Sequence, residues 1–399
     1  MYAPGIACST ALVQAGVDVL LVEQGRGLGG RCSTRHADVG GRRVQFEHGA
    51  QYLAPKPGTI LHALLPELRD AGMARNPAAR CKPVQRPERR PRPATQIEQW
   101  AEGRLGDVPA QRSGLLQWDA FAPWPPSKQC WVGTPSMAAL SRHLAARAAT
   151  QPGAGRLAVA TGWRVKPGSL VPSPSGGPPG ERWAALSAPT KGDGGGGVAT
   201  RHAAVLVSGF ASSVFNLVAP AAPSLAAPAG AIASDCCWAL MVAFTSPLLG
   251  AGRGGGPPVD GALVTGSDSL AWVARDSSKP GRSSEAECWV VHATAAWSNP
   301  RRDAQPAAVA QALLAEFLAA VGGYRGPAQA PLYLEAHRWG AAFPTNPAAA
   351  PGGFFADPEL ALGVAGDWCV GPRLGNAYES GSMLARWWLE QASSGGCAR

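Results

Sequence analysis

The chain has 399 residues, which is long enough for two or three domains of roughly 150 residues each. Hydrophobic residues make up 46% of it and exclude a wholly disordered protein, while 50 glycines, 37 prolines and only 16% charged residues indicate many loops. The net charge is +9, but residues 80–92 alone hold six basic residues against one glutamate. Prolines interleave with these arginines and no aromatic side chain offers a base-stacking surface, so we expect a flexible basic insert and no nucleic-acid partner.

The nine cysteines indicate neither a disulfide framework nor a metal site. No Cys-x-x-Cys pair occurs, and the adjacent Cys236 and Cys237 would close only a strained disulfide, so we expect reduced thiols and no bound metal. Reduced thiols predict an intracellular soluble protein. Prolines and serines break the apolar stretch 203–233, which predicts no membrane span. The first residues show no leader, so we expect a cytoplasmic protein, or one of an organelle such as the chloroplast if an upstream leader is missing.

The N-terminal residues predict part of a nucleotide-binding βαβ unit. Residues 5–16 predict a helix ended by Gly16, and residues 17–22 form an apolar β-branched run typical of a buried parallel strand. Glu23 follows this strand, where an acid accepts hydrogen bonds from ribose hydroxyls in a dinucleotide fold, and Gly5 lets the backbone approach a pyrophosphate. By its spacing, Gly5 takes the place of the third glycine in a G-x-G-x-x-G loop. We therefore expect the sequence to be truncated, with the first strand and two glycines missing.

A glycine- and arginine-rich loop follows directly after Glu23. Gly29 and Gly30 permit a tight backbone turn beside phosphates, and Arg31 supplies a cation with two parallel donors. A mobile linker is the alternative, but the position at the end of a predicted strand favours a phosphate cradle. We place Arg26 in the same cradle.

Near the C-terminus, residues 363–369 predict a short strand that ends in Gly-Asp, and an apolar helix follows from about residue 380 to 389. This order suits a dinucleotide whose ribityl chain is held by Asp367 and whose flavin ring meets a helix N-terminus, where the dipole stabilises an anionic ring. The segment between the two elements contains Gly375, Asn376 and Ala377.

Between these ends, three glycine- and proline-rich stretches predict flexible inserts at residues 76–96, 167–200 and 250–258. Residues 304–321 predict an amphipathic helix with Asp303 as its N-cap and a structural role.

Several blocks along the chain resemble the FAD-dependent amine oxidase superfamily, and within it the renalase-like branch. The blocks are Glu23, Gly29-Gly30-Arg31, His48-Gly49-Ala50-Gln51-Tyr52, residues 131–137, 237–241, 272–282 and 289–292, His337-Arg338-Trp339 and Gly366-Asp367-Trp368-Cys369. The most specific piece is the Ala-Arg-Asp-Ser-Ser-Lys-Pro-Gly-Arg run at 274–282. Asn376 departs from the pattern, because a glycine is usual there beside the flavin.

The resemblance implies an α/β fold with a Rossmann-type FAD-binding domain, its first strand missing, and a mixed-sheet α+β substrate domain like that of monoamine oxidases. The FAD-binding domain would be discontinuous, with residues 1–60, 132–215 and 345–399, and the substrate domain would take residues 61–131 and 216–344. FAD would bind noncovalently, with the backbone of Val165 against its adenine. The residues implied to hold FAD are Gly5, Glu23, Arg26, Gly29, Gly30, Arg31, His48, Gly49, Ala50, Gln51, Val165, Gly366, Asp367, Asn376 and Ala377.

The resemblance also implies the reaction. FAD would take a hydride from a reduced small-molecule substrate, in the renalase-like case a misreduced dihydronicotinamide isomer of NAD(P), and O₂ would reoxidise it to give hydrogen peroxide. An amine oxidase of the same superfamily is the alternative, although no lysine is placed convincingly for it, since Lys279 belongs to the Ser-Ser-Lys-Pro loop. A degenerate flavin fold without catalysis, or a protein that binds partners through the basic arm, are further alternatives.

The substrate-facing candidates are Gln51, His337, Trp339, Trp272 and Arg275. Gln51 would either hydrogen-bond the flavin or satisfy its own loop. His337 and Trp339 alternate on a predicted strand and so share a face, either toward the site or in a packed core. Trp272 and Arg275 would hold the substrate ring and a phosphate or carboxylate, unless Arg275 pairs with Asp276.

His48 is expected to contact flavin or backbone rather than act as an acid or base. His143 and His292 look like ordinary surface or core residues.

Overall fold

The computed structural model describes residues 3–70, 96–100, 104–113, 115–148, 150–173, 180–190, 197–248, 259–321 and 330–394. The α-helices of this part are α1 (Ala3–Gln14), α2 (Ile60–Ala63), α3 (Leu65–Asp70), α4 (Met137–Ala148), α5 (Ala211–Val218), α6 (Pro223–Gly230), α7 (Ala295–Ser298), α8 (Pro306–Ala320) and α9 (Leu374–Ser393). Short 3₁₀ helices that bear on the site are η1 (Gly30–Cys32), η3 (Asp276–Ser278) and η5 (Asp367–Cys369).

The strands are β1 (Val19–Glu23), β2 (Arg35–Val39), β3 (Arg42–Phe46), β4 (Gln96–Gln99), β5 (Leu105–Pro109), β6 (Ala122–Pro123), β7 (Trp131–Thr134), β8 (Leu157–Thr161), β9 (Trp163–Pro172), β10 (Trp183–Pro189), β11 (Val198–His202), β12 (Val205–Ser208), β13 (Ser234–Phe244), β14 (Gly261–Thr265), β15 (Leu270–Arg275), β16 (Glu287–Ala293), β17 (Tyr333–Pro344), β18 (Phe354–Asp357) and β19 (Leu362–Ala365). The expected insert at 250–258 lies outside the described residues, and so does the insert at 76–96, with its basic stretch 80–92, except for Gln96, the first residue of β4.

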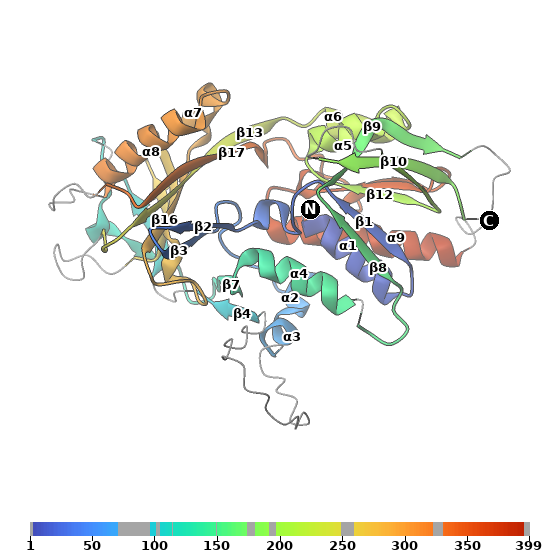
Figure 1. Ribbon diagram of the computed structural model, residues 1–399, viewed down its shortest axis with the longest axis horizontal. Coiled ribbons are helices and arrows are strands. Elements are labelled where there is room, and N and C mark those ends of the chain that lie inside the picture. Colours follow the sequence, from blue (N-terminus) through green and yellow to red (C-terminus); the bar gives the residue numbers. More distant parts are fainter. Residues whose placement is uncertain are drawn as a thin grey trace.

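A seven-stranded mixed sheet forms one half of the molecule, in the order β17-β13-β16-β15-β14-β5-β6 (Figure 1). Successive side chains of a strand point to opposite faces, so each strand serves two layers. On one face, Trp289 of β16 packs against Phe317 of α8, with ring centroids 5.4 Å apart. On the other face, Val290 and Met241 pack against Phe46 of the β2–β3 hairpin. The second face is the one that meets the rest of the molecule.

The other half contains the predicted nucleotide-binding unit. The helix and strand expected at the N-terminus are present as α1 and β1, and Gly16 between them has a φ of 86°. β1 pairs in parallel with β8, and β12 pairs in parallel with β19. α1 lies beside α9, where the two helices cross at Gly381 and Pro4 (Figure 1). The limits of the two domains, as drawn from the sequence, stay a prediction.

The expected flexible insert at 167–200 is wrong for its described part. β9, β10 and β11 form a three-stranded antiparallel sheet across this stretch. Alternate side chains of β10 are buried, with Trp183 and Ala185 in one hydrophobic cluster with α5. The glycine and proline content of the stretch obscured this period-two pattern in the sequence.

Two helix boundaries also differ from expectation. α9 begins at Leu374 rather than near residue 380, so Asn376 and Ala377 lie in its first turn. α8 begins at Pro306 with Gln305 in the N-cap position, and Asp303 instead pairs with Arg338 at 2.9 Å. Proline is favoured at the first position of a helix because the missing N–H has no intrahelical acceptor there.

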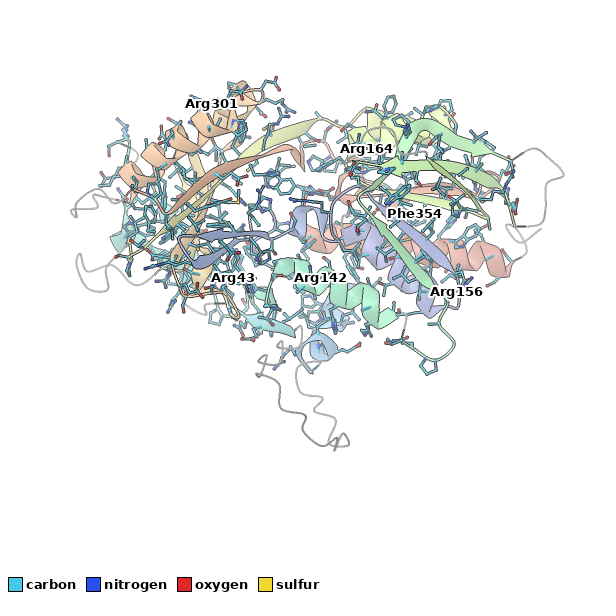
Figure 2. All side chains as sticks on the ribbon, in the orientation of Figure 1. Arg43, Arg142, Arg156, Arg164, Arg301 and Phe354 are labelled. Atoms are coloured by element: carbon cyan, nitrogen blue, oxygen red, sulfur yellow. The ribbon has the colours of Figure 1, made fainter. Side chains whose placement is uncertain are left out.

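The cations of the described residues are spread over many elements. Figure 2 labels Arg43 on β3, Arg142 on α4, Arg156 just before β8, Arg164 on β9 and Arg301 near α7. The positive charge of these residues is therefore not gathered on one helix or strand.

Within the described ranges, the free thiols are all buried; they belong to Cys8, Cys32, Cys130, Cys236, Cys237, Cys288 and Cys369. Among the helices of the same ranges, none combines the length and apolar character needed to cross a bilayer.

Candidate functional site

Arg31 connects three segments that are distant in sequence. Its Nη2 pairs with Asp367 Oδ1 at 2.6 Å, and its Nη1 donates to the carbonyl oxygen of Ala342 in β17 at 2.7 Å. The Arg31 carbonyl oxygen accepts the amide of Ala50 at 2.7 Å. The predicted phosphate loop, the histidine-containing block and the C-terminal Gly-Asp turn therefore meet around one arginine.

Glycine is required where these segments cross. A Cβ at Gly49 would overlap the Arg31 carbonyl oxygen and lie 3.2 Å from Cζ2 of Trp339. Gly29 has a φ of 137° and Gly30 a φ of 51°, conformations that other residues rarely adopt. The glycines picked out in the sequence thus serve close approach and turning at this junction.

A second group of predicted residues lies at the carboxyl end of β1. Glu23 is buried there, and its Oε1 accepts the amide of Gly25 at 2.5 Å. The carbonyl oxygen of Gly25 accepts the amide of Gly162, in the turn before β9, on which Val165 lies. A buried carboxylate and a strand backbone from separate segments thus share one sheet end. Arg26 is exposed.

The C-terminal turn leads into the long helix α9. Asn376 Nδ2 donates to the carbonyl oxygen of Gly371 at 3.4 Å, and Ala377 is buried. Arg373, the N-cap of α9, makes no side-chain capping bond, and a Cβ at Gly375 would meet no atom within 4 Å. The first turn of this helix therefore borders open space, with amides that no side chain caps.

Three aromatic rings from the histidine-containing block and β17 are in mutual contact. His337 and Trp339 share a face of β17, with ring centroids 4.4 Å apart. The His48 ring meets His337 edge-on at 4.7 Å and stacks on Trp339 at 5.2 Å. The His48 carbonyl oxygen accepts Trp339 Nε1 at 2.9 Å and lies 3.0 Å from His292 Nε2. His292, to which the sequence assigned no role, thus belongs to this cluster.

These histidines are held neutral. Burial lowers the pKa of His48 to about 3, helped by the neighbouring His337 and Arg35. Burial also lowers the pKa of His292 to about 4 and lowers that of His337. At neutral pH the cluster therefore offers polar contacts without a net charge.

Gln51 is engaged by its own loop and by a lysine. Its Nε2 donates to the carbonyl oxygens of Glu47 and Gly49, the latter at 3.1 Å, and its Oε1 accepts Lys279 Nζ at 3.2 Å. Lys279 also pairs with Asp276 Oδ1 at 2.5 Å, and neither side chain has any exposed surface. A buried lysine thus stands against a predicted site residue, although the sequence interpretation found no lysine for the site.

A second buried ion pair lies next to the first. Arg282 Nη2 lies 2.9 Å from Glu47 Oε1, and the Glu47 amide donates to Asp276 Oδ2 at 2.8 Å. Burial raises the pKa of Glu47 and lowers that of Lys279. Two cations and two carboxylates from the 47–52 loop and the 276–282 segment therefore form one buried cluster.

Trp272 belongs to an aromatic cluster between the two halves of the molecule. It stacks on Trp124 at 6.0 Å between ring centroids, and lies 5.8 Å from Tyr52 and 6.3 Å from Trp100. Its Nε1 is buried and has no hydrogen-bond partner among the described residues. Lys128 Nζ stands 3.1 Å from the ring centroid of Trp124. Trp272 is thus next to the site and retains an unused donor.

Arg275 does not share this environment. It is three positions from Trp272 on β15, so the two side chains point to opposite faces of the strand. It pairs with Asp260, not with Asp276, and its Nη1 lies 4.0 Å from Glu287 Oε1. The expectation that Arg275 and Trp272 hold one substrate together is therefore wrong, and so is the expected partner Asp276.

Of the predicted site residues, the structure brings together those around Arg31 and Gln51 and sets Arg275 apart. The side chains that sequence reasoning missed are Asp276, Lys279, Arg282 and His292. All four lie inside blocks that carried the family resemblance, and this was the available signal. Each of the four also has a partner in the 47–52 loop that lies more than 200 positions away in sequence, which no local pattern reveals.

Comparisons with known proteins agree with this architecture. The family model described as an NAD(P)-binding Rossmann-like domain matches residues 3–68. Among solved structures, an oxidoreductase from Methanosarcina mazei is 11% identical with a TM-score of 0.60, over 96% of this chain and 97% of that one.

Two amine oxidases show a similar likeness. Cyclohexylamine oxidase from Brevibacterium oxydans is 12% identical with a TM-score of 0.60, over 98% of this chain and 97% of that one. Wild-type putrescine oxidase bound to putrescine is 11% identical with a TM-score of 0.60 over the same shares. At such low identity the likeness concerns the fold. The chain therefore has a Rossmann-like nucleotide-binding unit within the two-part α/β fold of these oxidoreductases.

Proposed function

We propose that the protein is an oxidoreductase that binds FAD noncovalently and oxidises a reduced small molecule. The observation that carries the proposal is the junction at Arg31, where Asp367, Ala50 and Ala342 converge from three distant segments. Glu23 ends β1 and Asp367 follows β19, so the residues expected at the two ends of FAD both follow strands with parallel pairing, which supports the proposal. The family likeness of residues 3–68 and the fold of the solved oxidoreductases support the same conclusion.

The residues present fit FAD. Glu23 offers a buried carboxylate for the adenosine ribose, and the backbone of Val165 would accompany the adenine. Asp367, with Arg31 beside it, would hold the ribityl chain. The uncapped first turn of α9, open at Gly375, would meet the electron-rich edge of the flavin.

When bound, FAD would supply the redox chemistry: the hydride of a substrate C–H bond, which carries two electrons and one hydrogen, would reach O₂ by way of the flavin, and one further proton from solvent completes hydrogen peroxide. The chain supplies position more than acid–base chemistry, because histidines with pKa values of about 3 and 4 are weak bases. A dihydronicotinamide loses a hydride without losing a proton, so it suits a site of neutral imidazoles. This favours the renalase-like reaction, oxidation of misreduced dihydronicotinamide isomers of NAD(P).

Trp272 and Trp339 are the proposed substrate-facing aromatics. The free Nε1 of Trp272 would donate to a carboxamide oxygen of the substrate, and the His337–Trp339 pair would border the opposite side. Arg275 is not proposed again for this role.

A second candidate, an amine oxidase, is favoured by Lys279. This buried lysine lies against Gln51 and 4.8 Å from the ring centroid of Trp100, which itself contacts Trp272. The solved structures with this fold include oxidases of putrescine and cyclohexylamine by name. The substrate test must therefore include both classes.

The test is anaerobic reduction of the protein loaded with FAD. We expect a yellow protein that releases FAD on denaturation, and bleaching of the flavin by 6-dihydro-NAD, with hydrogen peroxide formed when air is admitted. Bleaching by putrescine or cyclohexylamine alone would establish the amine oxidase instead. A protein that takes up no FAD would contradict both candidates and point to a degenerate fold.

A further inference from the structure

The most specific sequence block, residues 274–282, has no part in the leading proposal; its Lys279 entered only as the residue that favours the second candidate. It places Asp276 and Lys279 beside the 47–52 loop, with no exposed surface on either side chain. Lys279 Nζ also stands 4.8 Å from the ring centroid of Trp100. The ammonium group is thus enclosed by a carboxylate, an amide oxygen and an aromatic face.

Lys279 determines which way the Gln51 amide points. An ammonium group only donates hydrogen bonds, so it must face Oε1, which it does at 3.2 Å. Nε2 is then directed at the carbonyl oxygens of Glu47 and Gly49. In a flipped amide, Nε2 would face the Lys279 ammonium group and Oε1 would face the two carbonyl oxygens. Both contacts are unfavourable, so the lysine permits one orientation only.

The same ion pair holds the loop at its other end. Asp276 Oδ2 accepts the Glu47 amide at 2.8 Å while Oδ1 pairs with Lys279. The backbone between these two anchor points carries His48, whose carbonyl oxygen meets Trp339 Nε1 and His292 Nε2. The Lys279–Asp276 ion pair holds the loop, and the loop carries His48. The position of the His48, His337 and Trp339 rings therefore depends on this ion pair.

Stability alone is a poor reason for this arrangement. Two buried opposite charges gain little over a well-packed neutral pair, because their desolvation offsets their attraction. A gain in specific geometry is the better explanation. We propose that Lys279 is a positioning residue: held by Asp276, it fixes the Gln51 carboxamide and through it the 47–52 loop at the candidate site. Its importance for the flavin rests on the proposed function.

The test separates positioning from stability with a double variant. Lys279→Met alone leaves Asp276 buried without its cation and lowers the melting temperature. Lys279→Met with Asp276→Asn removes both charges, so most of the lost melting temperature returns. Hydrogen exchange by mass spectrometry then follows a peptide covering residues 47–53. In this peptide the amide of Ala50 reports on the position of the loop, because it donates a hydrogen bond to the Arg31 carbonyl oxygen.

We expect the double variant to exchange this peptide roughly tenfold faster than the wild type, the order of change for a lost hydrogen bond from a charged donor. Wild-type exchange in a double variant of restored stability would overturn the proposal. Arg147→Met, which breaks the ion pair with Glu67 away from the loop, is the control and should leave this peptide unchanged.

Gln51→Leu tests the same link while the ion pair stays in place, and it decides the matter if the double variant does not fold. It should speed exchange of the peptide as the double variant does, and unchanged exchange would overturn the proposal. In FAD-loaded samples, both variants should also shift the visible absorption maxima of the flavin. If the wild type does not bind FAD, the proposed function is refuted. The hydrogen-exchange result alone then tests whether Lys279 positions the loop.

Discussion

At the scale of single residues, the side chain of Arg31 has geometry that no other residue type reproduces. Its planar guanidinium reaches Asp367 with one nitrogen and the Ala342 carbonyl oxygen with another. Asp367 is 4% exposed, so its charge depends on this cation for compensation. The Gly29-Gly30 turn places the arginine, and the sequence alone indicated both the turn and the cation.

Replacing Arg31 should therefore cost much more than replacing a surface arginine. Arg31→Met leaves Asp367 buried without its partner, and we expect a loss of about 2–4 kcal/mol in the free energy of unfolding, with weaker FAD binding. Denaturant unfolding and FAD titration measure the two effects. Arg156→Met, which breaks the exposed pair with Asp18, is the control and should leave the unfolding midpoint nearly unchanged, because solvent screens this pair. Equal unfolding midpoints for the two variants would contradict this account of Arg31.

At the scale of elements, the candidate site depends on how α1 and α9 cross. α1 enters the contact with its first residues, and α9 passes them at Gly381, where a Cβ would overlap the Pro4 carbonyl oxygen. The two helices lie beside each other in the half of the molecule away from the large sheet (Figure 1). The sequence indicated both helices, but it started α9 too late and did not show that they touch.

Two glycines of α9 should consequently respond in opposite ways to alanine. Gly381→Ala forces the helices apart and should destabilise the protein by about 1–3 kcal/mol or more, as overpacking does. Gly375→Ala meets open space and should leave stability unchanged or raise it by up to about 1 kcal/mol, because alanine is the better helix former. Thermal unfolding of the two variants without FAD checks this pair. A Gly381→Ala protein as stable as the wild type would show that the crossing is not tight.

At the scale of the whole molecule, the two halves meet through polar groups that are almost fully buried. The Arg282–Glu47 pair and the hydrogen bonds of Lys279 and Asp276 join the 47–52 loop to the segment between β15 and β16 of the large sheet. The rings of His48, His292 and His337 lie beside them. Because the histidines are neutral when folded, the free energy of unfolding is linked to pH at this junction.

The sign of this linkage follows from the direction of the pKa shifts. His48 and His292 have folded pKa values of about 3 and 4, below the usual 6.5, so the unfolded chain binds their protons first as the pH falls. Their contribution is fully present above about pH 6.5. Below that it is lost down to about pH 4 for His292 and about pH 3 for His48, at up to about 1.4 kcal/mol per pH unit for each histidine.

Denaturant unfolding at several pH values between 7.5 and 5.5 measures this slope above the range in which most carboxylates titrate. His292→Gln should reduce the slope of unfolding free energy against pH by the amount that one histidine contributes. A slope that the variant leaves unchanged would mean that His292 is not held neutral in the folded protein.

The sequence by itself determined the elements whose cause is local. The N-terminal helix and strand, the acid at the strand end, the glycine turns and the Gly-Asp turn follow from periodicity, capping and backbone freedom within a few residues. Only the tertiary structure decided which of these groups meet. Lys279 reaches Gln51 across 228 positions, and Arg275 turns away from Trp272 because odd spacing on a strand reverses the face. The described residues between 167 and 200 form part of a sheet despite the glycines and prolines of this stretch. Burial, charge pairing and helix crossing are properties of distant segments brought together, and no local pattern contains them.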